Sequence, residues 1–306
     1  MRRRIRIGTR GSQLALTQSR WVQAYVQRQH PHLEVELVTI TTSGDRFVEQ
    51  PLSTIGGKGL FVKEIEEGLC AGSIDCAVHS MKDVPGELAP GLMIAAVPAR
   101  EDPRDVLITR DGATLTGLPH GAHLGTSSLR RMALVRAARV DLEVTPLRGN
   151  VDTRLRKLAR GDFDAIVLAS AGLRRLGMEP SGMVFLDLQT FVPAIGQGAL
   201  AIETRADETA ELLAPLDHAP THVAVTAERA FLARAGGSCR TPLAAHATID
   251  NDRLELHGLV ASPDGRQVVR GHRRGPVSTA SALGAELADE LLGRGGADIL
   301  RALGVS

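Results

Sequence analysis

Arg4-Ile5-Arg6-Ile7-Gly8-Thr9-Arg10-Gly11-Ser12 is the stretch of sequence that decides the fold. Charged and apolar side chains alternate at its start, which is typical of a β-strand. The glycines then allow a tight turn, and Ser12 can cap a helix that carries apolar residues from Leu14 to Val26. A strand that leads into a helix in this way is the first half of a βαβ unit, so the stretch predicts an α/β fold.

The same pattern continues along the first part of the chain. Residues 33–40 are predicted as the next strand, residues 60–69 as a short amphipathic helix and residues 74–78 as a buried strand. This alternation predicts a mostly parallel sheet with helices on both faces. We assign residues 1–98 to a first domain.

A second lobe begins with a related pattern. His123-Leu124 leads into Gly125-Thr126-Ser127-Ser128 and an apolar-periodic helix, and strands are predicted over residues 142–147 and 165–168. Residues 191–195 lead into Gly196-Gln197-Gly198, which we interpret as a return crossing. We therefore predict a second domain over residues 104–192 and a segment over residues 199–216 that returns to the first domain.

The pattern changes after about Pro220. Three alternating segments, over residues 243–249, 254–260 and 267–272, are separated by polar turn sequences, and helices are predicted on either side. This predicts a small α+β third domain over residues 220–306, built on a three-stranded antiparallel sheet.

The composition argues against several classes of protein. The 306 residues include 43% hydrophobic and 23% charged residues, as in soluble globular proteins of two or three domains. A net charge of +1 and 3% aromatic residues argue against a nucleic-acid partner. No apolar run approaches the roughly 18 residues of a membrane span, and the basic start lacks the apolar core of a secretory signal.

The three cysteines predict a reducing, cytoplasmic setting. Cys70, Cys76 and Cys239 cannot form a closed set of disulfides, and their spacing matches no metal site, so no metal is expected. Cys239 lies in a glycine-rich loop beside Arg240, which favours its thiolate form. By residue type alone, a structural and a reactive role for Cys239 both remain open.

Polar side chains follow the predicted strand 74–78, in the run His79-Ser80-Met81-Lys82-Asp83-Val84-Pro85. Pro85 ends regular structure soon afterwards, and ligands of open α/β sheets bind at such carboxyl ends of strands. Asp83, beside Lys82, would stay ionised there and face a substrate cation. In an arbitrary chain, however, a polar turn without function is the commoner explanation.

Basic residues are concentrated in the second lobe. Residues 123–176 contain eleven Lys and Arg against five Asp and Glu. Guanidinium groups at helix starts and strand ends bind carboxylates well, and four arginines take such positions: Arg130, Arg131, Arg148 and Arg154. The hydroxyl groups of Ser12, Thr126, Ser127 and Ser128 would complete these anion-binding sites. The ligand is therefore expected to carry several carboxylates or phosphates.

Two glycine-rich runs do not match nucleotide-binding motifs. Gly56-Gly57-Lys58-Gly59 is not a P-loop, because that pattern has Ser or Thr after the lysine. A flexible lid that carries Lys58 is favoured instead. The turn from Gly8 to Gly11 lacks the dinucleotide-binding fingerprint.

Several short runs follow one another in order along almost the whole chain. They are residues 9–16, 56–61, 79–85, 100–105, 125–131, 147–151 and 193–198, together with the Cys239 loop. They include Thr9-Arg10-Gly11-Ser12-Gln13-Leu14-Ala15-Leu16 and Gly125-Thr126-Ser127-Ser128-Leu129-Arg130-Arg131. This combination closely resembles the porphobilinogen deaminase (hydroxymethylbilane synthase) family.

The resemblance implies a three-domain protein whose first two lobes are like those of type II periplasmic binding proteins. It implies a dipyrromethane cofactor, attached to Cys239 through a thioether. On this primer the family, a group of transferases in tetrapyrrole biosynthesis, joins four porphobilinogen molecules head to tail with loss of ammonia. Water then releases hydroxymethylbilane. Family precedent favours a monomer.

The resemblance also implies roles for individual residues. Asp83 would be the catalytic residue, in contact with pyrrole N–H groups and with the cation formed on deamination. The cofactor would be bound by Cys239 and by Ser12, Lys82, Asp83, Thr126, Ser127, Ser128, Arg130, Arg131 and Arg148. The substrate would be bound by Arg10, Ser12, Ser80, Arg148, Arg154, Arg175 and Gln197. Lys58 and Phe61 would form a lid, and His79 receives no role.

Two positions depart from the family pattern. Thr54 stands where some relatives have a lysine before the lid, so the lid contact of that lysine is not expected here. The cysteine loop reads Gly-Ser-Cys-Arg-Thr-Pro, where many relatives have Gly-Gly-Cys, which leaves attachment possible but would alter the loop's mobility.

Two other functions fit parts of the sequence. A non-catalytic two-lobed binding protein for a dicarboxylate metabolite would use the arginines but needs neither Asp83 nor Cys239. A nucleic-acid-binding module is disfavoured by the near-zero net charge and the scarce aromatic residues. We therefore expect porphobilinogen as the small-molecule substrate, and neither nucleic acid nor membrane as a partner.

Overall fold

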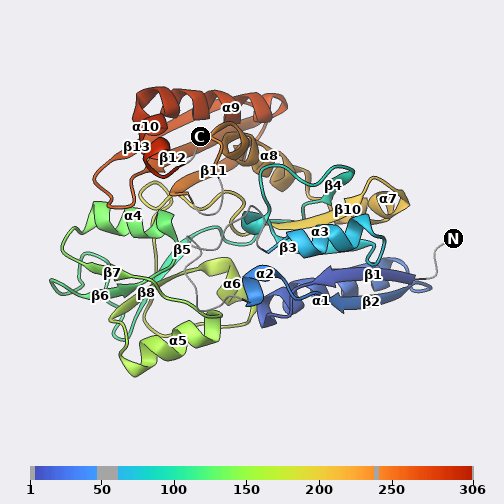
Figure 1. The fold of residues 1–306 in the computed structure, drawn as a ribbon, viewed down its shortest axis with the longest axis horizontal. Coiled ribbons are helices and arrows are strands. Elements are labelled where there is room, and N and C mark those ends of the chain that lie inside the picture. The colour runs from blue at the N-terminus through green and yellow to red at the C-terminus, as the bar shows by residue number, and fades with distance from the viewer. Residues whose placement is uncertain (1–3, 47–60, 238–240, 305–306) are drawn as a thin grey trace. The chain divides into compact units, whose positions relative to one another are not determined.

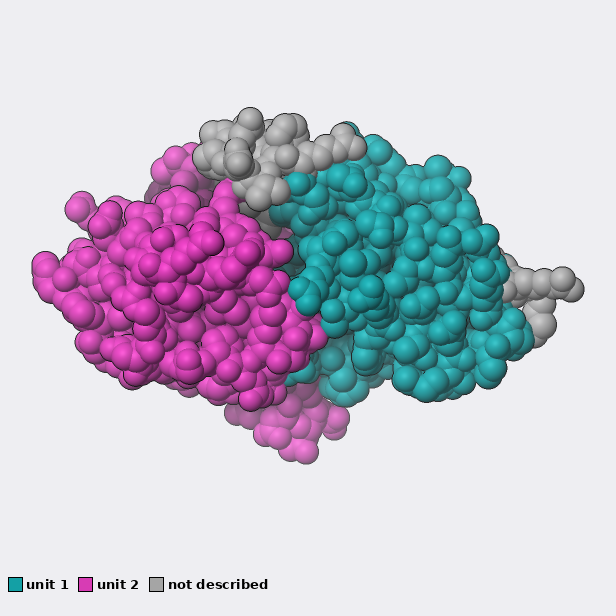
Figure 2. Space-filling model, turned by 90° about the horizontal axis from the view of Figure 1, so that it is seen from below, with its two compact units in different colours: residues 1–101, 199–222 teal, residues 102–198, 223–306 magenta. Residues whose placement is uncertain are grey.

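The computed structural model describes residues 4–46, 61–237 and 241–304 (Figure 1). The chain divides into two compact units, residues 1–101 with 199–222 and residues 102–198 with 223–306 (Figure 2). The first unit holds the first lobe and its return segment. The second unit holds the second lobe and the C-terminal part, so the finer division into three domains stays a prediction.

The first unit is built on a mixed five-stranded sheet with the strand order β2-β1-β3-β10-β4. Its strands are β1 (Arg4–Thr9), β2 (Glu34–Thr39), β3 (Cys76–Ser80), β4 (Leu92–Ala96) and β10 (Leu200–Arg205). Strand β1 pairs in parallel with β2 and β3, whereas β10 pairs antiparallel with β3 and β4. The helices are α1 (Gln13–Gln29), α2 (Ser43–Arg46), α3 (Lys63–Cys70) and α7 (Glu208–Leu213).

Helices cover both faces of this sheet (Figure 1). Val22 of α1 belongs to a hydrophobic cluster on one face, and Ile65 of α3 belongs to a cluster on the other. Residues of β3 alternate between the two, because Cys76 and Val78 join the first cluster and Ala77 joins the second. Strand β3 is therefore buried on both sides, which fixes the position of the polar run that follows it.

Helix α1 begins where the sequence predicts. Ser12 has an extended backbone, with φ −68° and ψ 147°, and its hydroxyl accepts a hydrogen bond from the N–H of Ala15 at 3.3 Å. Gly8 lies in a close contact just before this turn, because a Cβ atom there would lie 2.3 Å from Cδ1 of Ile74, whose side chain would have to shift. The opening stretch thus forms a strand, a turn and a capped helix, as predicted.

The second unit contains a further mixed five-stranded sheet, with the order β7-β6-β8-β5-β9. Its strands are β5 (Asp105–Thr109), β6 (His123–Gly125), β7 (Glu143–Thr145), β8 (Ala165–Ala169) and β9 (Met183–Phe185). The helices of this lobe are α4 (Leu129–Ala138), α5 (Val151–Arg160) and α6 (Ser170–Arg175). Helices α4 and α5 cover opposite faces of the sheet (Figure 1), since Leu134 and Leu158 belong to separate clusters.

The two sheets have the same topology. Each sheet has one strand, β10 or β5, that runs antiparallel to its neighbours, and it is the first strand formed after the chain passes over from the other unit. When the other four strands are numbered along the chain, the order in each sheet is second, first, third, antiparallel strand, fourth. This confirms the predicted α/β fold with two similar lobes of the type II periplasmic-binding-protein kind. The short match between residues 8–9 and 125–126 marks equivalent positions, each at the end of the first strand in its lobe.

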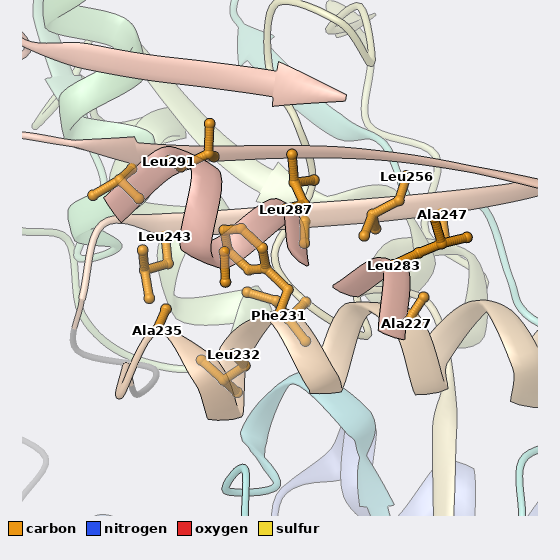
Figure 3. Packing of buried hydrophobic residues seen from close by; sticks show 14 of the residues in the cluster. Ala227, Phe231, Leu232, Ala235, Leu243, Ala247, Leu256, Leu283, Leu287 and Leu291 are labelled. Atoms are coloured by element: carbon orange, nitrogen blue, oxygen red, sulfur yellow. The ribbon is translucent and has the colours of Figure 1, made fainter. Parts of the chain in front are cut away.

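The C-terminal part is an antiparallel meander with helices packed on it, as predicted. It consists of β11 (Leu243–Asp250), β12 (Arg253–Ala261), β13 (Val268–Pro276), α8 (Ala219–Arg234), α9 (Ala280–Leu291) and α10 (Ala297–Ala302). Phe231 of α8 is fully buried in its core, together with Leu256 and Leu287 (Figure 3). Helices α8 and α9 approach closely, because a Cβ atom on Gly284 would lie 2.1 Å from the carbonyl oxygen of Ala227.

The helices described by the structure include none that is long and apolar enough to span a membrane.

Candidate active site

The run from His79 to Pro85 lies at the carboxyl end of β3, as the sequence predicts. Residues Met81–Asp83 form a single 3₁₀ turn. The N–H of Met81 donates to the carbonyl oxygen of Ala199 at 3.0 Å, and that of Val84 donates to the carbonyl oxygen of Met81 at 3.1 Å. The Met81 side chain is buried and Asp83 is half-buried, so the turn is anchored while its carboxylate stays accessible.

A pocket within the first unit opens at this turn. Its lining includes five residues of the predicted site, Arg10, Ser12, Phe61, Ser80 and Asp83. They come from three separate stretches of the chain, the β1–α1 turn, the start of the segment before α3, and the end of β3. The structure therefore brings these predicted residues together around one space. Lys82 lies in the same turn and is half-buried.

Arg10 is held in the pocket by two neighbours that the sequence analysis did not identify as partners. Its Nε atom donates to Oδ1 of Asp45 at 3.2 Å, and its guanidinium carbon lies 4.2 Å from the centroid of the Phe61 ring. Burial raises the pKa of Asp45, but hydrogen bonds from Arg10 and Thr42 outweigh it and hold this pKa below its usual value. Arg10 is therefore a pre-oriented cation at this pocket.

Gln18 is a second residue that the sequence analysis missed. Its side chain is 3% exposed, and its Nε2 atom donates to Oγ of Ser80 at 3.1 Å. Gln18 lies on the buried face of α1, so its position in a helix gave no separate functional signal. Its amide fixes the Ser80 hydroxyl within the pocket.

The predicted basic residues of the second unit surround a buried carboxylate. Arg130 and Arg131 are 3% and 6% exposed, and each has a guanidinium nitrogen 2.8 Å from a carboxylate oxygen of Asp105. Gln197 donates to the same carboxylate at 2.9 Å and accepts from Arg131 at 3.3 Å. Burial raises the pKa of Asp105, but the two guanidinium groups outweigh it and hold this pKa far below its usual value.

The hydroxyl groups before α4 hold the turn in which they lie. Ser128 accepts from the N–H of Arg131 at 3.4 Å as the cap of α4, and Ser127 donates to the carbonyl oxygen of Leu147 at 2.7 Å. The hydroxyl of Thr126 accepts from the N–H of Ser128 at 3.3 Å. These contacts place the start of α4 beside the residues that precede α5.

Arg154 carries the clearest sign of an anion-binding site. Its Nε atom donates to the carbonyl oxygen of Gly149 at 2.8 Å, and no carboxylate among the residues that the structure describes lies within ion-pair distance. Burial, followed by the positive charges of Arg131 and Arg148, lowers the pKa of Arg154 to about 10. Arg175 donates to the carbonyl oxygen of Gly198 at 2.6 Å. The charges of Arg131 and Arg148 thus add to that of Arg154.

Part of the predicted site lies outside the described residues. Cys239, the predicted attachment point, and Lys58 of the predicted lid are both in this group, as is Thr54. Within residues 4–46, 61–237 and 241–304, no three His, Cys, Asp or Glu side chains gather closely enough to hold a metal ion.

Asp105→Asn is expected to destabilise the second unit by about 3–5 kcal/mol, because it leaves two buried guanidinium groups without their counter-ion. The folded-state pKa of Asp105 is depressed, so its contribution is present above the unfolded pKa of about 3.9 and is lost as pH falls. Urea unfolding should therefore show a difference from wild type that shrinks below about pH 4. Asp289→Asn, which breaks an exposed pair with Arg234, is the control and should change stability little.

The chain matches known sequence families over most of its length. Residues 5–212 match the family described as "Porphobilinogen deaminase, dipyromethane cofactor binding domain", and residues 222–293 match "Porphobilinogen deaminase, C-terminal domain". The porphobilinogen deaminase of Syntrophotalea carbinolica is 54% identical over 304 residues, which cover 99% of this chain and 96% of that protein. The porphobilinogen deaminase of Roseiflexus castenholzii is 52% identical over 302 residues, covering 98% and 99%.

Among solved structures, the chain is similar to the periplasmic VFT2 domain of Bordetella pertussis BvgS. The TM-score is 0.40 at 14% sequence identity, over 70% of this chain and 85% of that one.

Proposed function

The chain belongs to the porphobilinogen deaminase family, and from this premise we propose that it is a hydroxymethylbilane synthase. This transferase joins four porphobilinogen molecules head to tail with loss of ammonia, and water then releases the linear tetrapyrrole. The observation that carries the proposal at the level of residues is the pocket at the end of β3, where Asp83 lies with Arg10, Ser12 and Ser80. The alternative, a non-catalytic binding protein, is not favoured by the family.

The residues of the second unit fit the dipyrromethane cofactor that the family name implies. This group carries acetate and propionate side chains, and Arg154 lies in a cluster of positive charge with no described carboxylate at ion-pair distance. Carboxylates of a ligand would relieve that like-charge repulsion. We propose that the following residues bind them: Thr126, Ser127, Ser128, Arg130, Arg131 and Arg148. When bound through Cys239, the cofactor supplies the pyrrole to which the first substrate molecule is joined.

The role proposed for Asp83 follows from its charge and position. When the C–N bond of the substrate aminomethyl group breaks, the electron pair leaves with ammonia and a positive charge remains on the pyrrole. A carboxylate held at the pocket by the turn after β3 stabilises that charge and accepts the pyrrole N–H. Arg10, Ser12 and Ser80 are proposed to bind substrate carboxylates in this pocket, with Phe61 as its wall.

Arg154→Ala is expected to raise the KM for porphobilinogen about 10- to 100-fold, since hydrogen bonds to charged groups contribute roughly 1.5–3 kcal/mol. The dependence of KM on salt should become weaker, because one charge is removed from the interaction. Arg156→Ala, an exposed residue on the same helix, is the matched control and should leave KM unchanged. An equal effect of both substitutions would remove Arg154 from substrate binding.

The proposed activity is tested directly by incubating the purified protein with porphobilinogen. One molecule of ammonia should appear for each porphobilinogen consumed, with a linear tetrapyrrole as the product in mass spectrometry. Binding without ammonia release would favour the non-catalytic binding protein instead. We further propose that the enzyme is a cytoplasmic monomer without nucleic-acid or membrane partners. The monomer rests on family precedent, the cytoplasmic setting on the cysteines, and the absence of those partners on the composition.

A further inference from the structure

His79, which received no role in the sequence analysis, lines the same pocket as Asp83. Its side chain is nevertheless almost fully buried, 3% exposed, at the end of β3. Its Nε2 atom lies 2.9 Å from Oε2 of Glu203, a residue of β10 that is completely buried. A buried carboxylate in contact with one nitrogen of an imidazole fixes both the orientation and the tautomer of the ring.

The tautomer follows from the hydrogen-bonding capacity of the two groups. With Glu203 ionised, its carboxylate can only accept, and Nε2 of His79 is then the donor of their hydrogen bond. The other ring nitrogen, Nδ1, then has a lone pair and makes no hydrogen bond to a described residue. The imidazole of this residue therefore has one nitrogen bonded to Glu203 and one, Nδ1, that can take a proton.

Charged groups face His79 from the elements packed around it. Glu203 on β10 contacts it, Glu66 on α3 faces the pair, and Asp83 and Arg10 line the same pocket. Burial, then the charge of Glu203, raises the pKa of Glu66 above its usual value. Glu203 is the carboxylate that contacts His79 and can balance a proton on it.

We propose that His79 is a second catalytic residue, which takes the proton that the α-carbon of each porphobilinogen unit loses when the next unit is joined to it. Glu203 is its positioning residue, which holds the ring and stabilises it once protonated. In this arrangement the buried carboxylate holds the imidazole, and the imidazole takes the proton from the reacting atom. The carboxylate itself stays ionised. The inference rests on the proposed function.

The reaction releases a proton that such a group can take. The substrate ammonium group leaves as ammonia and its C–N bond electrons go with nitrogen, which leaves a cation. The α-carbon of the neighbouring unit forms the new C–C bond with that cation and then releases its proton, which restores the aromatic ring. His79 takes the proton at Nδ1 and passes it to the released ammonia, so ammonium enters and ammonium leaves.

His79→Gln tests the proton-transfer role. Its amide N–H can still donate to Glu203, but the side chain cannot take up a proton, so turnover should fall about 10²- to 10⁴-fold. With porphobilinogen deuterated at its free α-carbon, the isotope effect on kcat should be larger in His79→Gln than in wild type. A purely structural role of His79 would lower the rate without raising the isotope effect.

His246→Gln is the matched control. His246 is also a buried histidine beside a fully buried glutamate, 3.4 Å from Glu228, but it lies in β11 and does not line the pocket. Its substitution should leave turnover and the isotope effect at wild-type values. Equal losses in His79→Gln and His246→Gln would show that His79 acts only through stability.

Glu203→Gln provides a test that does not depend on loss of His79. Removal of the negative charge destabilises the protonated ring, so the acid limb of the kcat–pH profile should move to lower pH. An unchanged limb would overturn the positioning role. Nitrogen-15 NMR of histidine-labelled wild-type protein should show the Nε2–H tautomer for His79, identified by its absence in His79→Gln, and an Nδ1–H tautomer would overturn the assignment.

These outcomes are separable from those that concern the proposed function. If wild type releases no ammonia from porphobilinogen, the proposed function fails. If wild type is active and His79→Gln turns over at the same rate, or more slowly with an unchanged isotope effect, the proposed function stands and the role of His79 is overturned.

Discussion

Asp83→Asn is expected to lower the turnover of porphobilinogen by about 10²- to 10³-fold, the usual cost of removing one group that stabilises developing charge. Asparagine has nearly the same shape as aspartate, so the 3₁₀ turn and its hydrogen bonds to Ala199 and Met81 should persist. Only the negative charge that faces the cation is lost. The loss should therefore appear in kcat, with folding stability close to that of wild type.

The measurement is steady-state release of ammonia from porphobilinogen by both proteins. Glu87→Gln is the control, because Glu87 is an exposed acid a short distance further along the chain and does not line the pocket. It should leave kcat unchanged. Turnover of Asp83→Asn near the wild-type rate would remove Asp83 from its catalytic role. A partial covalent mass excess in Asp83→Asn would show that the variant still assembles its cofactor.

Cys239→Ala is expected to abolish both turnover and any covalent mass beyond that of the polypeptide. The physical reason is that a thioether needs a thiolate, and alanine offers no atom to which the dipyrromethane can be attached. Turnover should fall below detection, because no primer is held for the first substrate molecule. Intact mass spectrometry of the denatured protein measures the first effect and ammonia release the second.

Cys70→Ala is the matched control for this prediction. Cys70 is a free and exposed cysteine at the end of α3, so it tests whether any accessible thiol serves as the attachment point. The variant should keep the full mass excess and full turnover. Loss of the excess in Cys70→Ala, or its retention in Cys239→Ala, would move the attachment point away from Cys239.

Much of the fold could be predicted because the features that determine it, such as helix caps and short turns, lie within a few residues of one another. Ser12 caps α1 three residues ahead of its partner Ala15, and Gly8 marks a close approach to the side chain of Ile74. The meander at the C-terminus was equally clear, since its strands are joined by short polar turns. Strand β10 shows the limit of this reasoning, because its antiparallel pairing with β3 depends on a crossing of more than 100 residues.

The site was only partly predictable, because its partners come from distant parts of the chain. Arg10 and Asp45 are 35 residues apart, and His79 and Glu203 are 124 residues apart. No periodicity or spacing connects such pairs. Asp105 did carry a signal, since it is an acid that opens an apolar strand and a buried acid needs a cation. Its pairing shows that Arg130 and Arg131 also neutralise a carboxylate of the chain itself.

The intact mass of the denatured wild-type protein, recorded before and after brief mixing with porphobilinogen, tests the central claim most directly. The account predicts a starting mass above that of the polypeptide by a two-pyrrole unit. It then predicts equal increments, each of one porphobilinogen less one ammonia. A chain that has the mass of its sequence alone, yet converts porphobilinogen to a linear tetrapyrrole, would contradict it.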